Sequence, residues 1–286
     1  MFFYFCVRII LRCYSIEFFR HEIISDRVIR IIDILNNCCY LVIGDDRACL
    51  LDTLDGFGDL KEYCRRFTDK EIFVILTHGH IDHVAGCCFF DEVYINHRDV
   101  ALFKEHADTS YRLKQYSNTP FLKDIAIKDF NPMYDGQLKD IEDGEVFDLG
   151  GLHIKMILVS GHTKGMMVPL IVEERMVVFG DACGVGVLLL GEMSTVASEY
   201  LRSLKKLKTF ENEYDLVLRN HGTFTSDKDI LDNVMECCED IISGNVCGQE
   251  IEMCGHKGYV VKPIDENGNR LDGKMGNIKY MDYNAC

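Results

Sequence analysis

The chain has 286 residues, of which 48% are apolar and 27% are charged. This composition is typical of a globular protein with a buried core, in one large domain or two modest ones. With only 4 prolines and no low-complexity tract, the chain does not look disordered. Its formal net charge of −15 disfavours binding to nucleic acids and anionic membranes, because like charges repel.

The N-terminal segment, residues 1–16, is apolar but is interrupted by Arg8 and Arg12. A bilayer-spanning helix needs ~20 apolar residues, about twice the length of this run. A secretory signal places its basic residues first and small residues before the cleavage site, which is a different order. We therefore expect an apolar extension or a first strand, in a cytoplasmic protein.

The 14 cysteines also indicate a reducing compartment. No CxxC motif occurs, and the chain is larger than most disulfide-stabilised scaffolds. Neighbouring side chains point to different sides of a strand or helix, which disfavours a bond within any of the adjacent pairs. We expect reduced cysteines that serve as small buried hydrophobic residues.

In chain order, the first predicted elements are short apolar strands over residues 28–33, 39–43 and 48–52. A helix over 58–67 and a strand apolar on both faces over 72–76 follow. A charged helical region is expected over 97–132, then two strands within 144–159 and a strand pair over 167–172 and 176–179. The last elements are a helix over 194–208, a strand over 215–218 and a helix over 226–242.

Two blocks of strands, each followed by helices, predict an α/β protein with an αββα fold. This fold is a four-layer sandwich of two mixed β-sheets flanked by helices. We expect this catalytic domain to occupy residues 17–245. Residues 246–286, which are rich in Gly, Asn and Asp, are expected to form a C-terminal appendage.

The most informative segment is THGHIDH, which directly follows the buried strand over 72–76. Four potential metal ligands fall within six positions of it: His78, His80, Asp82 and His83. A single histidine is usually an ordinary core residue. Three imidazoles and a carboxylate in one loop, however, need a shared positive charge, which a metal ion supplies. These ligand types suit zinc, iron or manganese.

Three later segments share one design, in which a potential ligand follows a strand and lies beside a glycine. These ligands are His162 in a GHT turn, Asp181 in a GD turn and His221 in a late HG pair. Each alone is a weak signal, because His and Asp are common in turns. Together with THGHIDH they predict one shared site.

The HxHxDH segment, the GHT and GD turns and the late HG resemble the metallo-β-lactamase superfamily of hydrolases, from about Phe18 to Ile242. The resemblance implies two divalent ions, with zinc expected first and iron or manganese as alternatives. Seven side chains would hold them: His78, His80 and His162 at one ion, Asp82, His83 and His221 at the other, and Asp181 between them. It also implies that Asp52 supports these ligands from behind. Leu54 departs from the family's Asp-Thr-Gly, so the shape of that loop is in question.

The resemblance implies a hydrolase for a small molecule that carries an ester, thioester, lactone or phosphoester bond. Water bridging two metals ~3.5–4 Å apart would have its pKa lowered toward ~7 and would attack that bond. Asp82 and Asp181 are assigned catalytic roles, Asp82 also as a proton shuttle. Because true zinc β-lactamases usually carry Cys where Asp181 stands, the glyoxalase II and lactonase side of the family is favoured. Ribonuclease Z is disfavoured by the acidic charge.

Several alternatives stay open at this point. An iron oxidoreductase similar to persulfide dioxygenases is the main rival, whereas di-iron reductases usually carry Glu where His80 stands. A non-catalytic metal-binding protein is disfavoured by the complete ligand set. Three tyrosines of the presumed lid are weaker candidates for oxyanion donors: Tyr111, Tyr116 and Tyr134. The oligomeric state is open, with a homodimer as one expectation.

Overall fold

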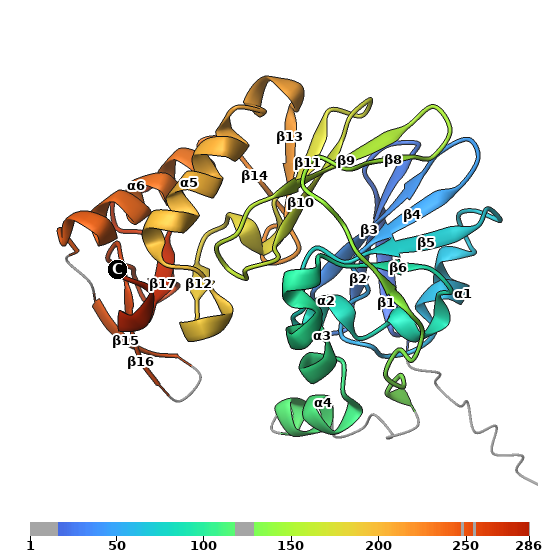
Figure 1. Ribbon diagram of the computed structural model, residues 1–286, viewed down its shortest axis with the longest axis horizontal. Helices are drawn as coiled ribbons and strands as arrows, with labels where there is room; N and C mark the ends of the chain where they lie inside the picture. The colour runs from blue at the N-terminus through green and yellow to red at the C-terminus, as the bar shows by residue number, and fades with distance from the viewer. Residues whose placement is uncertain (1–16, 118–128, 247–248, 254–255, 286) are drawn as a thin grey trace, which may run out of the picture.

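The structure is a computed structural model that describes residues 17–117, 129–246, 249–253 and 256–285 (Figure 1). The predicted N-terminal extension, residues 1–16, lies outside the described residues. Within the described part of the chain, no helix has the length and apolar character needed to cross a membrane.

The first sheet contains seven strands that follow one another in chain order. They are β1 (Phe19–Ile23), β2 (Val28–Asp33), β3 (Cys38–Ile43), β4 (Ala48–Leu51), β5 (Ile72–Ile75), β6 (Val93–Tyr94) and β7 (Leu138–Lys139). The pairs from β1 to β4 are antiparallel and those from β4 to β7 are parallel, so the sheet is mixed.

The second sheet contains six strands in the order β14-β13-β11-β10-β9-β8. Their bounds are β8 (Val146–Asp148), β9 (His153–Leu158), β10 (Met167–Ile171), β11 (Met176–Val178), β13 (Leu216–Leu218) and β14 (Thr225–Ser226). Only β11 and β13 pair in parallel, so this sheet is mixed as well.

The two sheets pack face to face and are covered by helices on their outer sides (Figure 1). Tyr40 and Phe73 of the first sheet share a buried cluster with Ile154 and Met167 of the second. The first sheet is covered by α1 (Leu60–Cys64), α2 (Ile81–Val84) and α3 (Val100–His106), whereas α4 (Thr109–Tyr116) lies beyond α3 and contacts Phe57 through Tyr116. The second is covered by α5 (Ala197–Lys208) and α6 (Ile230–Ser243). The predicted αββα sandwich is confirmed.

Strands β2 and β3 show why the apolar runs in the sequence mark this core. Every residue of β2 is buried, because both faces of the strand are covered. Alternate residues point to opposite sides: Ile29 and Ile31 face the helices, whereas Val28 and Ile32 face the second sheet.

A third sheet was not predicted. It has the order β12-β17-β16-β15, with β12 (Val187–Leu189), β15 (Gln249–Met253), β16 (His256–Val260) and β17 (Ile278–Tyr280). β17 runs parallel to β12, and Ile278 belongs to the same buried cluster as α5 and α6. The C-terminal segment is thus attached to the sandwich through this sheet, while the proposed division into a domain and an appendage stays a prediction.

Some predicted elements differ in detail. The region 97–132 contains the short helices α3 and α4 up to Tyr116, and residues 118–128 lie outside the description. In α5, the leucines Leu201, Leu204 and Leu207 lie on one stripe and are buried. The helix predicted over 226–242 begins at Ile230, and Ser226 lies in β14. Every cysteine within the described ranges is a free thiol, and all but Cys88 are buried.

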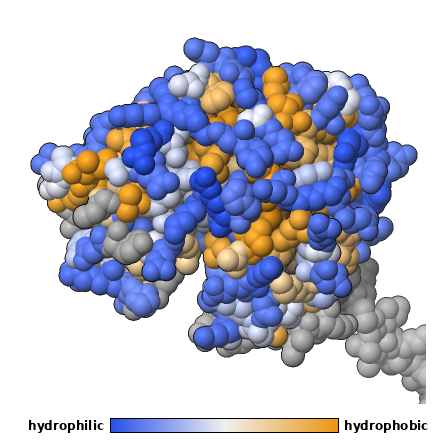
Figure 2. All heavy atoms as spheres, viewed as in Figure 1, coloured by the Kyte–Doolittle hydropathy of each residue, from blue (hydrophilic) through white to orange (hydrophobic). Residues whose placement is uncertain are grey.

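The face of the molecule drawn in Figure 2 is mostly hydrophilic. A notch in this face separates the C-terminal strands β15 and β16 from helix α4 (Figures 1 and 2).

Candidate metal centre

The predicted ligands lie where strands end at one edge of the sandwich. The chain leaves β5 at Ile75 and enters α2 with His80 at the N-cap, so four ligands occupy one tight connection. His162 lies between β9 and β10. Asp181 and His221 follow β11 and β13, and the parallel pairing of those strands brings the two residues to the same edge.

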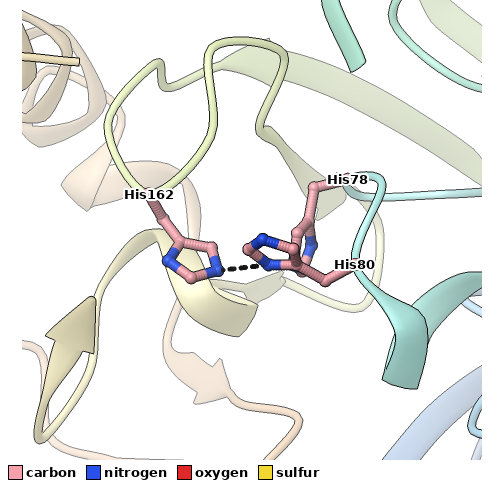
Figure 3. Close-up of side chains that lie close together, drawn as sticks. All are labelled: His78, His80 and His162. Carbon is pink, nitrogen blue, oxygen red and sulfur yellow. Dashed lines mark hydrogen bonds between the residues drawn. The ribbon is translucent and has the colours of Figure 1, made fainter. Parts of the chain in front are cut away.

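Three imidazoles form the first cluster (Figure 3). The distance from His78 Nε2 to His80 Nδ1 is 3.0 Å, and that from His162 Nε2 to His80 Nδ1 is 2.8 Å. All three residues are buried. Their ring nitrogens point at one another, which is the arrangement of three ligands around a single ion rather than of a packed apolar core.

The second cluster contains Asp82, His83, Asp181 and His221. Asp82 Oδ2 lies 3.5 Å from His83 Nε2 and 3.2 Å from His221 Nε2. Asp181 faces both clusters, because its Oδ1 is 3.2 Å from His221 Nε2 and its Oδ2 is 3.5 Å from His162 Nε2. The structure therefore brings all seven predicted ligands together, with Asp181 between the two groups. Their roles as ligands stay a prediction.

Hydrogen bonds behind the rings determine which ring nitrogen is free. Four histidines direct Nδ1 at an oxygen outside the clusters: His78 at Thr77 Oγ1 (3.1 Å), His83 at Asp52 Oδ2 (2.9 Å), His162 at the Leu188 carbonyl (2.8 Å) and His221 at Asn37 Oδ1 (2.8 Å). A carbonyl or carboxylate oxygen can only accept, and the Thr77 hydroxyl donates its own proton to Asp52, so each Nδ1 carries the proton. In the neutral ring, the lone pair then lies on Nε2 and faces the cluster.

His80 has the opposite orientation. Its Nδ1 faces the first cluster, and its Nε2 lies 3.3 Å from Met193 Sδ, a weak acceptor. His80 would therefore contribute Nδ1 where the others contribute Nε2. In their neutral form, all five imidazoles present a lone pair to one of the two clusters, and neutral imidazole and carboxylate are the donors that divalent zinc accepts.

The electrostatics of the two clusters differ. Burial lowers the pKa of His78, and its neighbours His83 and His80 lower it further; burial also lowers the pKa of His80, so these two rings are neutral at neutral pH. Burial opposes a charge on His221, yet Asp181 and Asp82 raise its pKa to about 10. Burial likewise raises the pKa of Asp181, but His221 and His83 hold it well below the usual value.

One buried nitrogen of the second cluster, His83 Nε2, would be satisfied by a metal ion. His83 Nε2 has no hydrogen-bond partner among the described residues, although Asp52 fixes the other side of the ring. An unpaired buried nitrogen of this kind costs free energy, on the order of 1–3 kcal/mol. A cation between His83, Asp82 and Asp181 would satisfy it, so the residues present fit a second divalent ion.

Asp52 connects several parts of the centre. Its carboxylate accepts hydrogen bonds from the Thr77 amide (2.7 Å) and from Asn220 Nδ2 (3.1 Å), besides the ring of His83. In the loop after Asp52, Leu54 has a φ of +61° and is 1% exposed. Here a buried leucine occupies a left-handed conformation that favours glycine, and its burial offsets the strain.

Sequence reasoning missed two residues that position ligands. Asp99 accepts hydrogen bonds from the Gly79 amide (3.1 Å), Thr163 Oγ1 (2.6 Å) and the Gly165 amide (2.7 Å), so it joins the loops that carry His78 and His162. Asn37 orients His221 from 184 positions away. No local signal marks either residue, because their partners are distant in sequence.

The three candidate tyrosines lie elsewhere. The hydroxyl of Tyr116 donates to Asp55, that of Tyr111 lies 3.0 Å from His106 Nε2, and that of Tyr134 donates to the Gln137 carbonyl (3.5 Å). Of the described residues that line the cavity next to the metal centre, none is one of these tyrosines. They are therefore not placed as oxyanion donors.

A cavity of about 640 Å³ opens beside the two clusters. Asp82, His162, Asp181 and His221 form one wall. Further lining comes from the C-terminal segment, which the sequence had suggested was peripheral: Asn269, Arg270, Gly273, Lys274 and Met275. The volume is that of a small-molecule site.

Comparison with known proteins adds to this geometry. The family model described as metallo-beta-lactamase superfamily matches residues 35–217, more than half of the chain. A hydroxyacylglutathione hydrolase, GloC, of Haemophilus influenzae is 24% identical over 202 residues, which are 66% of this chain and 86% of that protein. An atrochrysone carboxyl ACP thioesterase of Aspergillus fumigatus is 22% identical over 203 residues, 66% of this chain but only 54% of that protein.

Among solved structures, a metallo-beta-lactamase from Pontibacter korlensis superimposes with a TM-score of 0.57 at 14% identity. The match covers 78% of this chain and 99% of that one. A likeness at this identity shows a shared fold and does not identify a substrate.

Proposed function

The chain belongs to the metallo-β-lactamase superfamily, and on that premise we propose that it is a binuclear metal-dependent hydrolase for small thioesters or esters. The observation that carries the proposal is the convergence of five imidazoles and two carboxylates, with ring lone pairs directed inward, beside a cavity of about 640 Å³. Two relatives whose names describe a hydroxyacylglutathione hydrolase and an ACP thioesterase favour thioesters first. Lactones and phosphoesters are the next classes.

Divalent ions held there would supply an activated water and a positive charge for the substrate oxygen. The protein's own groups hold and orient the rest. His83 and His221 hold the pKa of Asp82 well below its usual value against the effect of burial, so this carboxylate is ionised at neutral pH. Because Asp82 also lines the cavity, it can accept a proton during attack on a bound substrate.

The proposal is tested by a substrate panel with zinc-loaded protein. The panel contains an acyl thioester, an aryl ester, a lactone, a phosphodiester and a β-lactam, and turnover of the thioester or ester is expected. Asp181→Ala should lower kcat at least ~100-fold, because the carboxylate shared by both clusters is lost. Asp140→Ala, at an exposed aspartate that accepts from His97, serves as the matched control.

Two results would contradict the proposal. One is protein with two bound zinc ions per chain that hydrolyses nothing in the panel. The other is iron-loaded protein that consumes oxygen with a persulfide substrate, which would favour the iron oxidoreductase instead. An oxygen electrode and metal analysis on the same preparations measure both.

A further inference from the structure

The wall of the cavity carries a charge opposite to that of the chain. Asp and Glu outnumber Lys and Arg by 46 to 31 over the whole sequence. Among the described residues that line the cavity, the carboxylates are Asp82 and Asp181, both predicted metal ligands. The remaining charged side chains there are all cations: Arg219, Arg270 and Lys274.

Two of these cations already have carboxylate partners. Arg270 Nε donates to Asp272 Oδ1 (2.9 Å), and its Nη2 forms an ion pair with the same carboxylate. Its Nη1 donates to the Gly276 carbonyl. Lys274 Nζ lies 2.7 Å from Glu236 Oε2. These pairs fix the C-terminal segment in place, and each of the two cations already has a carboxylate as its counter-charge.

Arg219 is different. It is 6% exposed, and no described carboxylate lies within ion-pair distance of it. Its Nη2 donates to Thr223 Oγ1 (2.7 Å), whereas Nε is buried without a hydrogen-bond partner among the described residues. The charge of Asp181 acts on Arg219 from beyond ion-pair distance, so the buried guanidinium has no carboxylate bonded to it, and an incoming anion would supply one.

The surroundings of Arg219 leave room for such an anion. Arg219 lies two positions before His221, at the end of β13, so its side chain and the metal centre share one cavity. Glycines flank the guanidinium: a Cβ added at Gly184 would lie 3.6 Å from Nη1, and one at Gly222 would lie 3.5 Å from Nη2. The absence of side chains at these positions keeps the approach to the guanidinium open.

We propose that Arg219 binds an anionic group of the substrate, a carboxylate or a phosphate, next to the bond that is cleaved. The planar guanidinium fork matches either group with two parallel hydrogen bonds. The enzyme would then select acyl compounds with a negative charge near the reacting carbonyl over neutral compounds of the same size. That the bound anion belongs to a substrate rests on the proposed function, whereas the anion site itself is tested by binding alone.

The binding test uses isothermal titration calorimetry on zinc-loaded protein with butyrate, succinate and 3-phosphonopropionate. Each ligand offers one carboxylate to the metals, and only the last two carry a second anionic group. We expect succinate or 3-phosphonopropionate to bind at least ~10-fold more tightly than butyrate to the wild type. The dianion whose affinity falls more in Arg219→Gln carries the group, carboxylate or phosphonate, that Arg219 prefers.

Variants then assign the effect to one residue. Arg219→Gln should reduce the preference for the dianion to near unity, and Arg219→Lys should retain part of it, because the charge remains but the fork is lost. Lys274→Gln is the matched control, since this cation also lines the cavity but is paired with Glu236, and it should leave the preference unchanged. Equal binding of butyrate and both dianions by the wild type overturns the inference, as does a preference that survives in Arg219→Gln.

Kinetics with 4-nitrophenyl hemisuccinate and 4-nitrophenyl butyrate separate this inference from the proposed function. If the calorimetric preference holds but neither ester nor any thioester is hydrolysed, the anion site stands and the hydrolase proposal fails. If the wild type and Arg219→Gln hydrolyse both esters with the same ratio of kcat/KM values, the hydrolase stands and the role of Arg219 is wrong. The expected result is a higher KM for the hemisuccinate in Arg219→Gln, with the butyrate much less affected.

Discussion

Asp99 is buried between two loops that carry predicted ligands, and both of its carboxylate oxygens accept hydrogen bonds from them. In Asp99→Asn one oxygen becomes an NH₂ group that must face N–H or O–H donors. We expect the affinity for zinc to fall ~10–100-fold, as for other residues that orient metal ligands. Competition with a chromogenic chelator measures the affinity. Asp140→Asn is the control, and an unchanged affinity in Asp99→Asn would exclude a positioning role.

Gly79 separates His78 from His80 and lies against the start of α3. A Cβ at this position would lie 2.8 Å from the Phe103 amide nitrogen and 2.9 Å from the Asp99 carbonyl oxygen. Because both are backbone atoms, Gly79→Ala requires the ligand loop to move, and we expect a loss of about 2 kcal/mol in the free energy of unfolding.

Urea unfolding with zinc present measures this loss. The matched control is Gly186→Ala, where the added Cβ would meet only the end of Lys279, at 3.5 Å from its Cε. The control should stay within ~0.5 kcal/mol of the wild type. Equal stability of the two alanine variants would show that the loop tolerates the shift.

The seven clustered side chains could be predicted from sequence because they are dense, follow apolar strands and lie beside glycines. Asp99, Asn37 and Arg219 could not, since each is an ordinary polar residue until the fold brings its partners near. Gly79 allows close packing against α3, and it does not belong to the glycines with a left-handed backbone.

At the scale of elements, prediction succeeded where a strand is buried on both faces. β2, β3 and β5 are continuous apolar runs for that reason. The edge strand β1 was missed because four of its five residues are exposed. β12 and β17 were missed because each is three residues long and their pairing joins Val187 to Ile278, a contact that no local pattern encodes.

An ion cluster around Glu92 connects the parallel strands at one edge of the first sheet. Its carboxylate is 2.8 Å from Arg47 Nη2 and 2.6 Å from Lys139 Nζ, and it accepts a hydrogen bond from the Tyr94 hydroxyl (2.6 Å). Burial raises the pKa of Glu92, but Lys139, Tyr94 and Arg47 together lower it to about 2. The folded pKa is therefore below the ordinary value of 4.5.

This depressed pKa predicts a pH-dependent loss of stability. The contribution of Glu92 is fully present above pH 4.5 and is lost as the pH falls toward 2, because the unfolded state then binds more protons. Glu92→Gln should lower the free energy of unfolding near pH 6 by about 1 kcal/mol, allowing for partial exposure, and the deficit should shrink toward pH 3. Urea unfolding of metal-free protein at both pH values tests this, with the exposed Glu266→Gln as control. A deficit that is the same at both pH values would contradict it.

At the scale of the whole molecule, the predicted ligands are divided between the two sheets. His78, His80, Asp82 and His83 follow β5 of the first sheet, and the other three follow strands of the second. Ions bound at this junction would hold the two halves together. They would also replace the ion pairs of His83 and His221 with Asp82 and Asp181.

Metal removal should therefore destabilise the entire fold rather than one loop. A ligand present at 100 times its Kd stabilises the native state by about 2.7 kcal/mol. For a chain of this size that corresponds to a rise in Tm of at least ~5 °C. We expect that shift when zinc is added to chelator-treated protein, in one cooperative transition seen both by calorimetry and by far-ultraviolet circular dichroism. His162→Asn, which removes a ligand of the second sheet, should reduce the shift, whereas His153→Asn, at an exposed histidine paired with Glu173, should not. An identical Tm with and without zinc would mean that the seven side chains do not bind metal across the two sheets.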